Sequence, residues 1–86
     1  MPYLDRGTRA SLEEGRVPNE DGELNYLVTR LCDAFLMRTG LSYKNINQAI
    51  GALECAKLEL YRRIAAPYEE KKCRESGEVY VSVNSL

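Results

Sequence analysis

Histidine is absent from this 86-residue sequence. Because imidazole is the usual acid–base group near neutral pH and a common zinc ligand, catalytic triads built on histidine and histidine-ligated zinc sites are excluded. The patterns GxxxxGK, GxGxxG and GxSxG are also absent, which removes the sequence signatures of phosphate-binding loops, dinucleotide-binding folds and serine hydrolases. The side chains left for chemistry are carboxylates, tyrosines and arginines, and we expect no cofactor.

The sequence also lacks long apolar runs and a strong net charge. No apolar run reaches 18 residues and no signal-peptide pattern opens the chain, so we expect neither a membrane span nor export, and a cytoplasmic location. Twelve Lys and Arg against 13 Asp and Glu give a net charge of -1, which offers no general attraction to nucleic acid or anionic lipid. The three cysteines, Cys32, Cys55 and Cys73, are odd in number and far apart, which is typical of reduced residues in a core or an interface.

Residues 42–74 are predicted to form one long helix. Apolar residues recur there in steps of three and four, which places them on one face: Ile46, Ile50, Leu53, Ala56, Leu60 and Ile64. Ser42 is the expected N-cap. Pro67 lacks an N–H and its ring crowds the preceding turn, so the helix either kinks there or ends and restarts, and we favour the kink.

A second apolar band beside the first favours self-association through this helix. The 25 residues of 42–66 span roughly 37 Å as a helix, whereas a compact chain of this length has a radius of gyration of roughly 12 Å. The helix would therefore extend beyond a monomeric globule, and we expect a homodimer or larger oligomer. The small and tyrosine-rich face supplies the candidate interface residues, namely Gly51, Ala52, Cys55, Leu58, Tyr61, Ala65 and Tyr68. The alternative is that this band packs only on the other helix of the same chain.

The rest of the chain completes a mainly all-α single domain, residues 1–86. A second helix is predicted over residues 22–38, and the short turn after it predicts an antiparallel helical hairpin with the long helix. Residues 1–21 form an arm with a short helix, Thr8–Glu14, capped by Thr8 or Ser11, followed by a loop. In the tail, residues 78–86, the run EVYVSV alternates with period two and predicts a strand, which would pair with Met1–Leu4 or another copy, or stay disordered.

Charged residues on the long helix allow two functional hypotheses besides ordinary ion pairing, namely metal binding and nucleic-acid binding. The helical spacing predicts the pairs Glu54–Lys57, Glu59–Arg62, Glu59–Arg63, Glu70–Arg74 and Lys71–Glu75. Four carboxylates, Glu54, Glu59, Glu69 and Glu70, could hold a divalent cation if they converged across a dimer, as in small all-α nucleoside triphosphate pyrophosphohydrolases. Those enzymes use ExxE pairs, whereas Glu54 and Glu59 are five apart. Arg62, Arg63, Lys71 and Lys72 with Tyr61 and Tyr68 could contact nucleic acid, although interleaved acids argue against it.

The runs GELNYLVTRL (22–31), LSYKNINQAIGALECAKLELYRR (41–63) and APYEEKK followed by GEVY, together with the opening MPY, resemble a family of small uncharacterised proteins of bacteria and their phages. The resemblance reaches to Tyr80 and implies a small helical protein without an assigned activity. We therefore expect a non-enzymatic oligomeric interaction or assembly protein of phage or mobile-element origin. The alternatives are a metal-dependent nucleotide phosphohydrolase and a weak nucleic-acid-binding protein.

Overall fold

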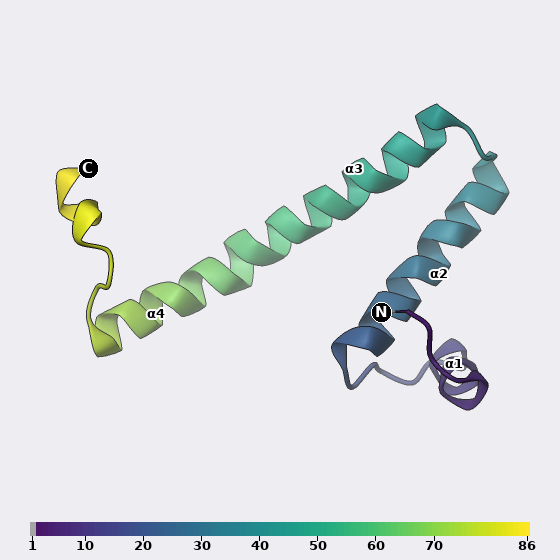
Figure 1. The fold of residues 1–86 in the computed structure, drawn as a ribbon, viewed down its shortest axis with the longest axis horizontal. Helices are drawn as coiled ribbons and strands as arrows, with labels where there is room; N and C mark the ends of the chain where they lie inside the picture. Colours follow the sequence, from purple (N-terminus) through teal and green to yellow (C-terminus); the bar gives the residue numbers. More distant parts are fainter. Residues whose placement is uncertain (1) are drawn as a thin grey trace. The chain divides into compact units, whose positions relative to one another are not determined.

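The structure is a computed structural model that describes residues 2–86, and every regular element in that range is helical. In chain order these elements are α1 (Arg6–Glu13), α2 (Asp21–Thr39), α3 (Tyr43–Leu60), a π-helical turn (Tyr61–Ala65), α4 (Ala66–Ser76) and a 3₁₀ helix (Val81–Ser85) (Figure 1). The all-α fold class is therefore confirmed. The chain forms two compact units, one ending at Ala49 and the other comprising Ile50–Leu86. The helical hairpin and the single-domain organisation stay predictions.

Helix α1 begins two residues before the predicted start, because its cap is Asp5 rather than Thr8 or Ser11. The Asp5 carboxylate accepts hydrogen bonds from the Thr8 backbone N–H at 2.9 Å and from the Thr8 hydroxyl at 3.0 Å. These bonds, the backbone one foremost, lower the pKa of the Asp5 carboxyl. Capping by Asp5 satisfies an N–H that has no partner within the helix.

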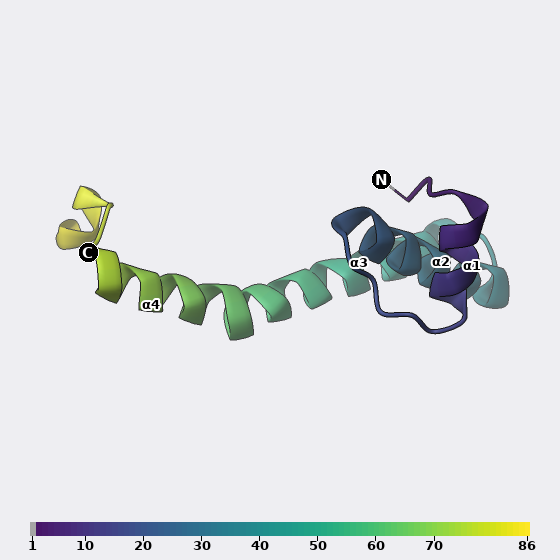
Figure 2. The same cartoon turned by 90° about the horizontal axis from the view of Figure 1, so that it is seen from below.

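The first unit has a small core where α1 packs against α2 (Figure 2). Leu12 of α1 is 2% exposed and Tyr26 of α2 is 7% exposed. The Tyr26 hydroxyl donates a hydrogen bond to the Glu13 carboxylate at 3.0 Å, and the Arg9 guanidinium lies 5.8 Å from the centre of the Tyr26 ring. Burial of the phenol, and then its bond to Glu13, raise the pKa of Tyr26. A tyrosine suits this position because its ring fills the core while its hydroxyl reaches the polar edge.

Arg16 holds the loop between α1 and α2 against both helices. Its Nε donates to the Ser11 hydroxyl at 3.0 Å, and its Nη1 lies 3.0 Å from a Glu23 carboxylate oxygen. The same Glu23 oxygen accepts the Asn19 backbone N–H at 2.9 Å. Glu23 thus supports the first turn of α2, and the bond from Arg16 is the main reason that the pKa of Glu23 is lowered.

The turn between α2 and α3 follows the predicted capping. Gly40 ends α2 with φ of 107°, a conformation that favours glycine, and its N–H donates to the Leu36 carbonyl at 2.8 Å. The Ser42 hydroxyl accepts the Asn45 N–H at 3.1 Å, which confirms Ser42 as the cap. Asn45 stands where a capping box has Glu or Gln, and its side chain instead donates to the carbonyls of Thr39 and Gly40 at 3.1 and 2.9 Å. Hydrogen bonds from groups at the end of α2 and at the start of α3 therefore hold the turn.

The long helix passes Pro67 by means of a π-helical turn, without ending. Helix α3 leads directly into the turn Tyr61–Ala65, and α4 follows with Pro67 in its first turn. The Ala66 N–H donates to the Tyr61 carbonyl, five residues back, and the backbone at Leu60, Ala65 and Ala66 stays right-handed helical. Pro67 lacks an N–H and would crowd a regular α-helical turn, and the wider turn gives its ring room. The predicted boundaries 42–74 thus extend to Ser76.

The predicted C-terminal strand is wrong. Gly77 ends α4 with φ of 91°, residues 78–80 are irregular, and Val81–Ser85 form a 3₁₀ helix instead. A strand needs a neighbour to accept its backbone hydrogen bonds, and no part of residues 2–86 supplies one. The proposed pairing segment does not help, because Pro2–Leu4 carry no strand and Met1 lies outside the described residues. The 3₁₀ helix satisfies part of the backbone locally.

Candidate functional site

The candidate interface residues all lie along the helical stretch from α3 to the start of α4. Leu58 and Tyr61 are each 53% exposed and Tyr68 is 58% exposed. Gly51, Ala52 and Cys55 are also exposed, and Ala65 is half-buried. No described residue of α3, the π-helical turn or α4 is buried. The surface predicted to mediate self-association is therefore accessible along its length.

The π-helical turn changes how these residues are arranged around the helix. Tyr61 and Tyr68 are seven residues apart and would share a face in a regular α-helix. One extra residue in the turn rotates the following side chains by roughly 100°, the angle that one residue occupies in an α-helix. Tyr68 is thus turned away from Tyr61. Sequence spacing could not reveal this rotation, and Pro67 was its only local signal.

Three of the four carboxylates considered as metal ligands are engaged in ion pairs along the helix. The Glu54 carboxylate lies 3.5 Å from the Lys57 ammonium, and Glu59 lies 2.6 Å from Arg62. Glu70 lies 4.0 Å from Arg74. Within residues 2–86, no three His, Cys, Asp or Glu side chains are grouped so that they could hold a metal ion. One copy of the described chain therefore does not bring Glu54, Glu59, Glu69 and Glu70 together.

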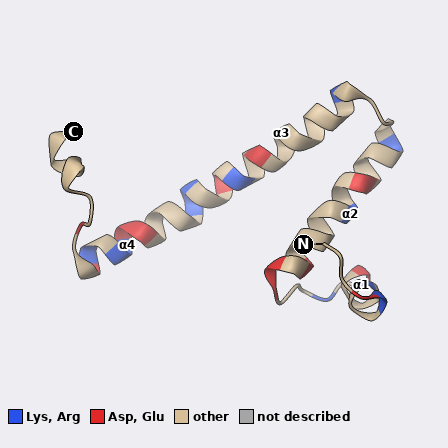
Figure 3. Cartoon of the chain, in the orientation of Figure 1, with Lys and Arg blue, Asp and Glu red and all other residues tan. Residues whose placement is uncertain are grey.

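The arginines considered for nucleic-acid binding share a carboxylate. Arg62 and Arg63 both lie within ion-pair distance of Glu59, at 2.6 and 3.6 Å. Acidic and basic residues alternate along α3 and α4, as Figure 3 shows. Near the C-terminus the observed pair is Lys72–Glu75 at 3.6 Å, one residue from the predicted Lys71–Glu75. The local field is therefore largely compensated, and such exposed pairs each contribute only about 0.2–1 kcal/mol.

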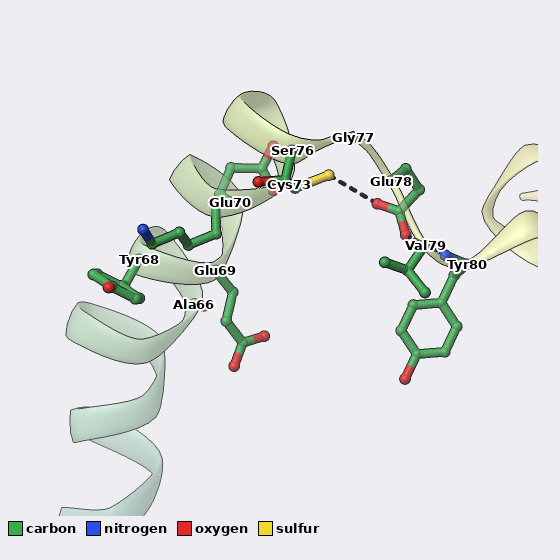
Figure 4. A pocket seen from close by; sticks show the side chains of 11 residues that line it. Ala66, Tyr68, Glu69, Glu70, Cys73, Ser76, Gly77, Glu78, Val79 and Tyr80 are labelled. Atoms are coloured by element: carbon green, nitrogen blue, oxygen red, sulfur yellow. Dashed lines mark hydrogen bonds between the residues drawn. The ribbon is translucent and has the colours of Figure 1, made fainter.

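A groove of about 560 Å³ lies between α4 and the tail. The chain turns at Gly77, and the Cys73 thiol of α4 then donates a hydrogen bond to the Glu78 carboxylate at 3.0 Å (Figure 4). The second oxygen of Glu78 accepts the Tyr80 backbone N–H at 2.8 Å. The residues that line the groove are Ala66, Tyr68, Glu69, Glu70, Lys72, Cys73, Ser76, Gly77, Glu78, Val79 and Tyr80. Glu78 thus links the tail to the last turns of α4.

The Cys73–Glu78 contact changes the pKa of both groups. The hydrogen bond to the carboxylate, and then burial, raise the pKa of Cys73, because the carboxylate opposes formation of a thiolate. The same hydrogen bond is the main cause of the lowered pKa of Glu78. Cys73 is therefore held as a thiol, which is the less nucleophilic form. The sequence does not indicate this groove, because nothing in the spacing from Cys73 to Glu78 predicts that the chain turns back after Gly77.

No helix within residues 2–86 combines the length and apolar character needed to cross a membrane. No curated protein and no solved structure matches the chain. The family model described as "Domain of unknown function (DUF6899)" matches residues 1–79, which is most of the chain. This match confirms the resemblance to an uncharacterised family, and it covers α1 to α4 and the turn after α4 as far as Val79. The chain belongs to the DUF6899 family, a domain of unknown function.

Proposed function

We propose that this protein is a non-enzymatic interaction protein that works as a homo-oligomer, with the helical surface between Ile50 and Tyr61 as its self-association surface. The observation that carries the proposal is the exposure of the second unit. No side chain in Ile50–Leu86 is buried, although this stretch carries leucines, isoleucines and tyrosines along its helix. An origin in phage or mobile elements stays a prediction.

Exposed apolar residues on a helix indicate a missing partner surface. Isolated helices are marginally stable in water, and most helical stability in proteins comes from packing of an apolar face. Leu58 and Tyr61 are each 53% exposed, and because they are three residues apart they lie side by side on the helix. Contiguous apolar surface of this kind is typical of protein–protein contacts. A second copy supplies a matching surface without requiring any other protein.

Small residues add a geometric reason for helix–helix contact. Gly51, Ala52 and Cys55 are exposed on α3, and a Cβ added at Gly51 would meet no atom within 4 Å. Gly51 costs about 1 kcal/mol of helix propensity relative to alanine. No packing within the described chain requires a glycine there. A close approach of another helix is a reason for its presence that fits the exposed surface.

The proposal is tested by the concentration dependence of thermal unfolding. A protein whose folded state is an oligomer gains stability by mass action, so its Tm rises with protein concentration. We expect the Tm, measured by circular dichroism at 222 nm, to rise by several degrees over a roughly hundredfold range of concentration. A Tm that stays constant over that range would contradict the proposal.

A further inference from the structure

We infer that two copies pair through α3 in antiparallel orientation, with a two-fold axis passing between Cys55 and Ala56. This inference rests on the proposed self-association, and it adds the orientation of the partner and the side of the helix that the partner covers, which carries Leu58 and Tyr61 but not Ala52 or Cys55. Three pairs of residues at equal distances from this point are chemically matched, namely Leu53 and Leu58, Glu54 and Lys57, and Ile50 and Tyr61. In an antiparallel pair, residues equidistant from the axis face each other across the interface.

The matched residues fall mainly on one side of α3. Ile50, Leu53, Glu54, Lys57, Leu58 and Tyr61 follow in steps of three, one, three, one and three, which places them on one face of a helix. All six are exposed. The face is therefore apolar at both ends and carries one acidic and one basic residue at its centre, a pattern that is self-complementary under two-fold rotation.

The central charges favour an antiparallel partner over a parallel one. Within one copy, the Lys57 ammonium lies 3.5 Å from the Glu54 carboxylate, and both side chains are more than half exposed. In the antiparallel pair each Lys57 also approaches the partner's Glu54, so four charges alternate around the axis. In a parallel pair in register, Glu54 would face Glu54 and Lys57 would face Lys57. Like charges facing each other across an interface oppose association.

The remaining charged residues create no conflict in this arrangement. Counted from the same point, the charged residues Glu59, Arg62 and Arg63 are equidistant with Ala52, Ala49 and Gln48 respectively. None of them faces a residue of like charge. Arg62 and Arg63 are also paired with Glu59 of their own helix. From residue 48 to residue 63, the one pair of facing charges is therefore Glu54 with Lys57, which is attractive.

Distances between spin labels on two copies distinguish the orientations. One variant keeps Cys55 as its only cysteine by carrying Cys32→Ala and Cys73→Ser, and the second adds Cys55→Ala and Lys71→Cys to these changes. In the antiparallel pair, residue 55 lies about 2 Å along the axis from its copy and residue 71 lies about 45 Å from its copy, at 1.5 Å rise per residue. In a parallel pair both positions give the same distance.

We expect the distance measured by pulsed electron paramagnetic resonance to be tens of ångströms longer at residue 71 than at residue 55. Equal distances at the two positions would overturn the antiparallel inference and leave self-association standing. A longer distance at residue 55 than at residue 71 would overturn the position of the axis. The mass of each labelled variant is measured alongside by light scattering. A monomeric mass for both variants and for the unaltered chain, with no coupling between labels, would remove the proposed function together with this inference.

Discussion

Replacing Leu58 by alanine should weaken self-association while leaving the helix intact. Complete burial of a leucine side chain contributes about 1.5–3 kcal/mol, and 53% of Leu58 is exposed in the single chain. A partner that covers the remainder therefore gains roughly 1 kcal/mol per copy, or roughly 2 kcal/mol for a symmetric dimer. This corresponds to a roughly thirtyfold increase in Kd. Alanine is the best helix former, so α3 itself should not lose stability.

The assay is sedimentation equilibrium over a dilution series, with Val17→Ala as the matched control. Val17 is an exposed aliphatic residue in the loop between α1 and α2, outside the proposed surface. We expect its replacement to leave Kd unchanged. If Leu58→Ala and Val17→Ala gave the same Kd as the unaltered protein, the reasoning that places the interface on this part of α3 would be refuted.

Three further predictions concern the other parts of the structure. Leu12→Ala should lower the free energy of unfolding of the α1–α2 unit by about 2–3 kcal/mol, because it opens a cavity at a buried residue. Urea unfolding followed through the α1 amides measures this loss. A change below about 0.5 kcal/mol would contradict the presence of a small core around Leu12. The Cys73–Glu78 contact should be intact between pH 4.5 and pH 9.0, the ordinary pKa values of a carboxyl and a thiol. Because the pKa of Glu78 is lowered, the contact should weaken on the acid side only as pH falls through that lowered value. Because the pKa of Cys73 is raised, it should weaken on the alkaline side only as pH rises through that raised value. Cys73→Ser should abolish the alkaline loss and keep the acid loss, as followed by the carbon NMR shift of the Glu78 carboxylate, and an unchanged alkaline transition would show that the thiol is not responsible. Pro67→Ala should restore an α-helical turn and raise the hydrogen-exchange protection of residues 65–68, whereas Pro18→Ala in the loop should not; persistence of the π-helical turn would mean that Pro67 does not cause it.

Much of the helical architecture could be predicted from local signals. The steps of three and four in apolar residues located α2 and the long helix to within two residues at each end. Ser42 acts as the cap in the predicted position, because this role depends on the residue's own side chain. The ion pairs on α3 also followed from spacing, since residues three and four apart are neighbours on a helix.

The errors came where a local pattern had more than one physical outcome. The alternation in EVYVSV predicts a strand only if another strand is present to pair with it, and the described chain supplies none. The π-helical turn before Pro67 was not specified by the sequence, because proline forbids a regular helical turn without determining how the helix passes it. The groove at the end of α4 depends on Glu78 turning back to Cys73, a contact made possible by the backbone conformation at Gly77.

The central claim, that the long helix mediates self-association, is tested most directly by the mass of the protein in solution. Light scattering coupled to size-exclusion chromatography gives that mass independently of shape. We predict twice the mass of a single chain at micromolar concentrations and above, decreasing on dilution. The mass of a single chain at every concentration would contradict the claim, and the exposed apolar residues of α3 would then have to be covered within one chain.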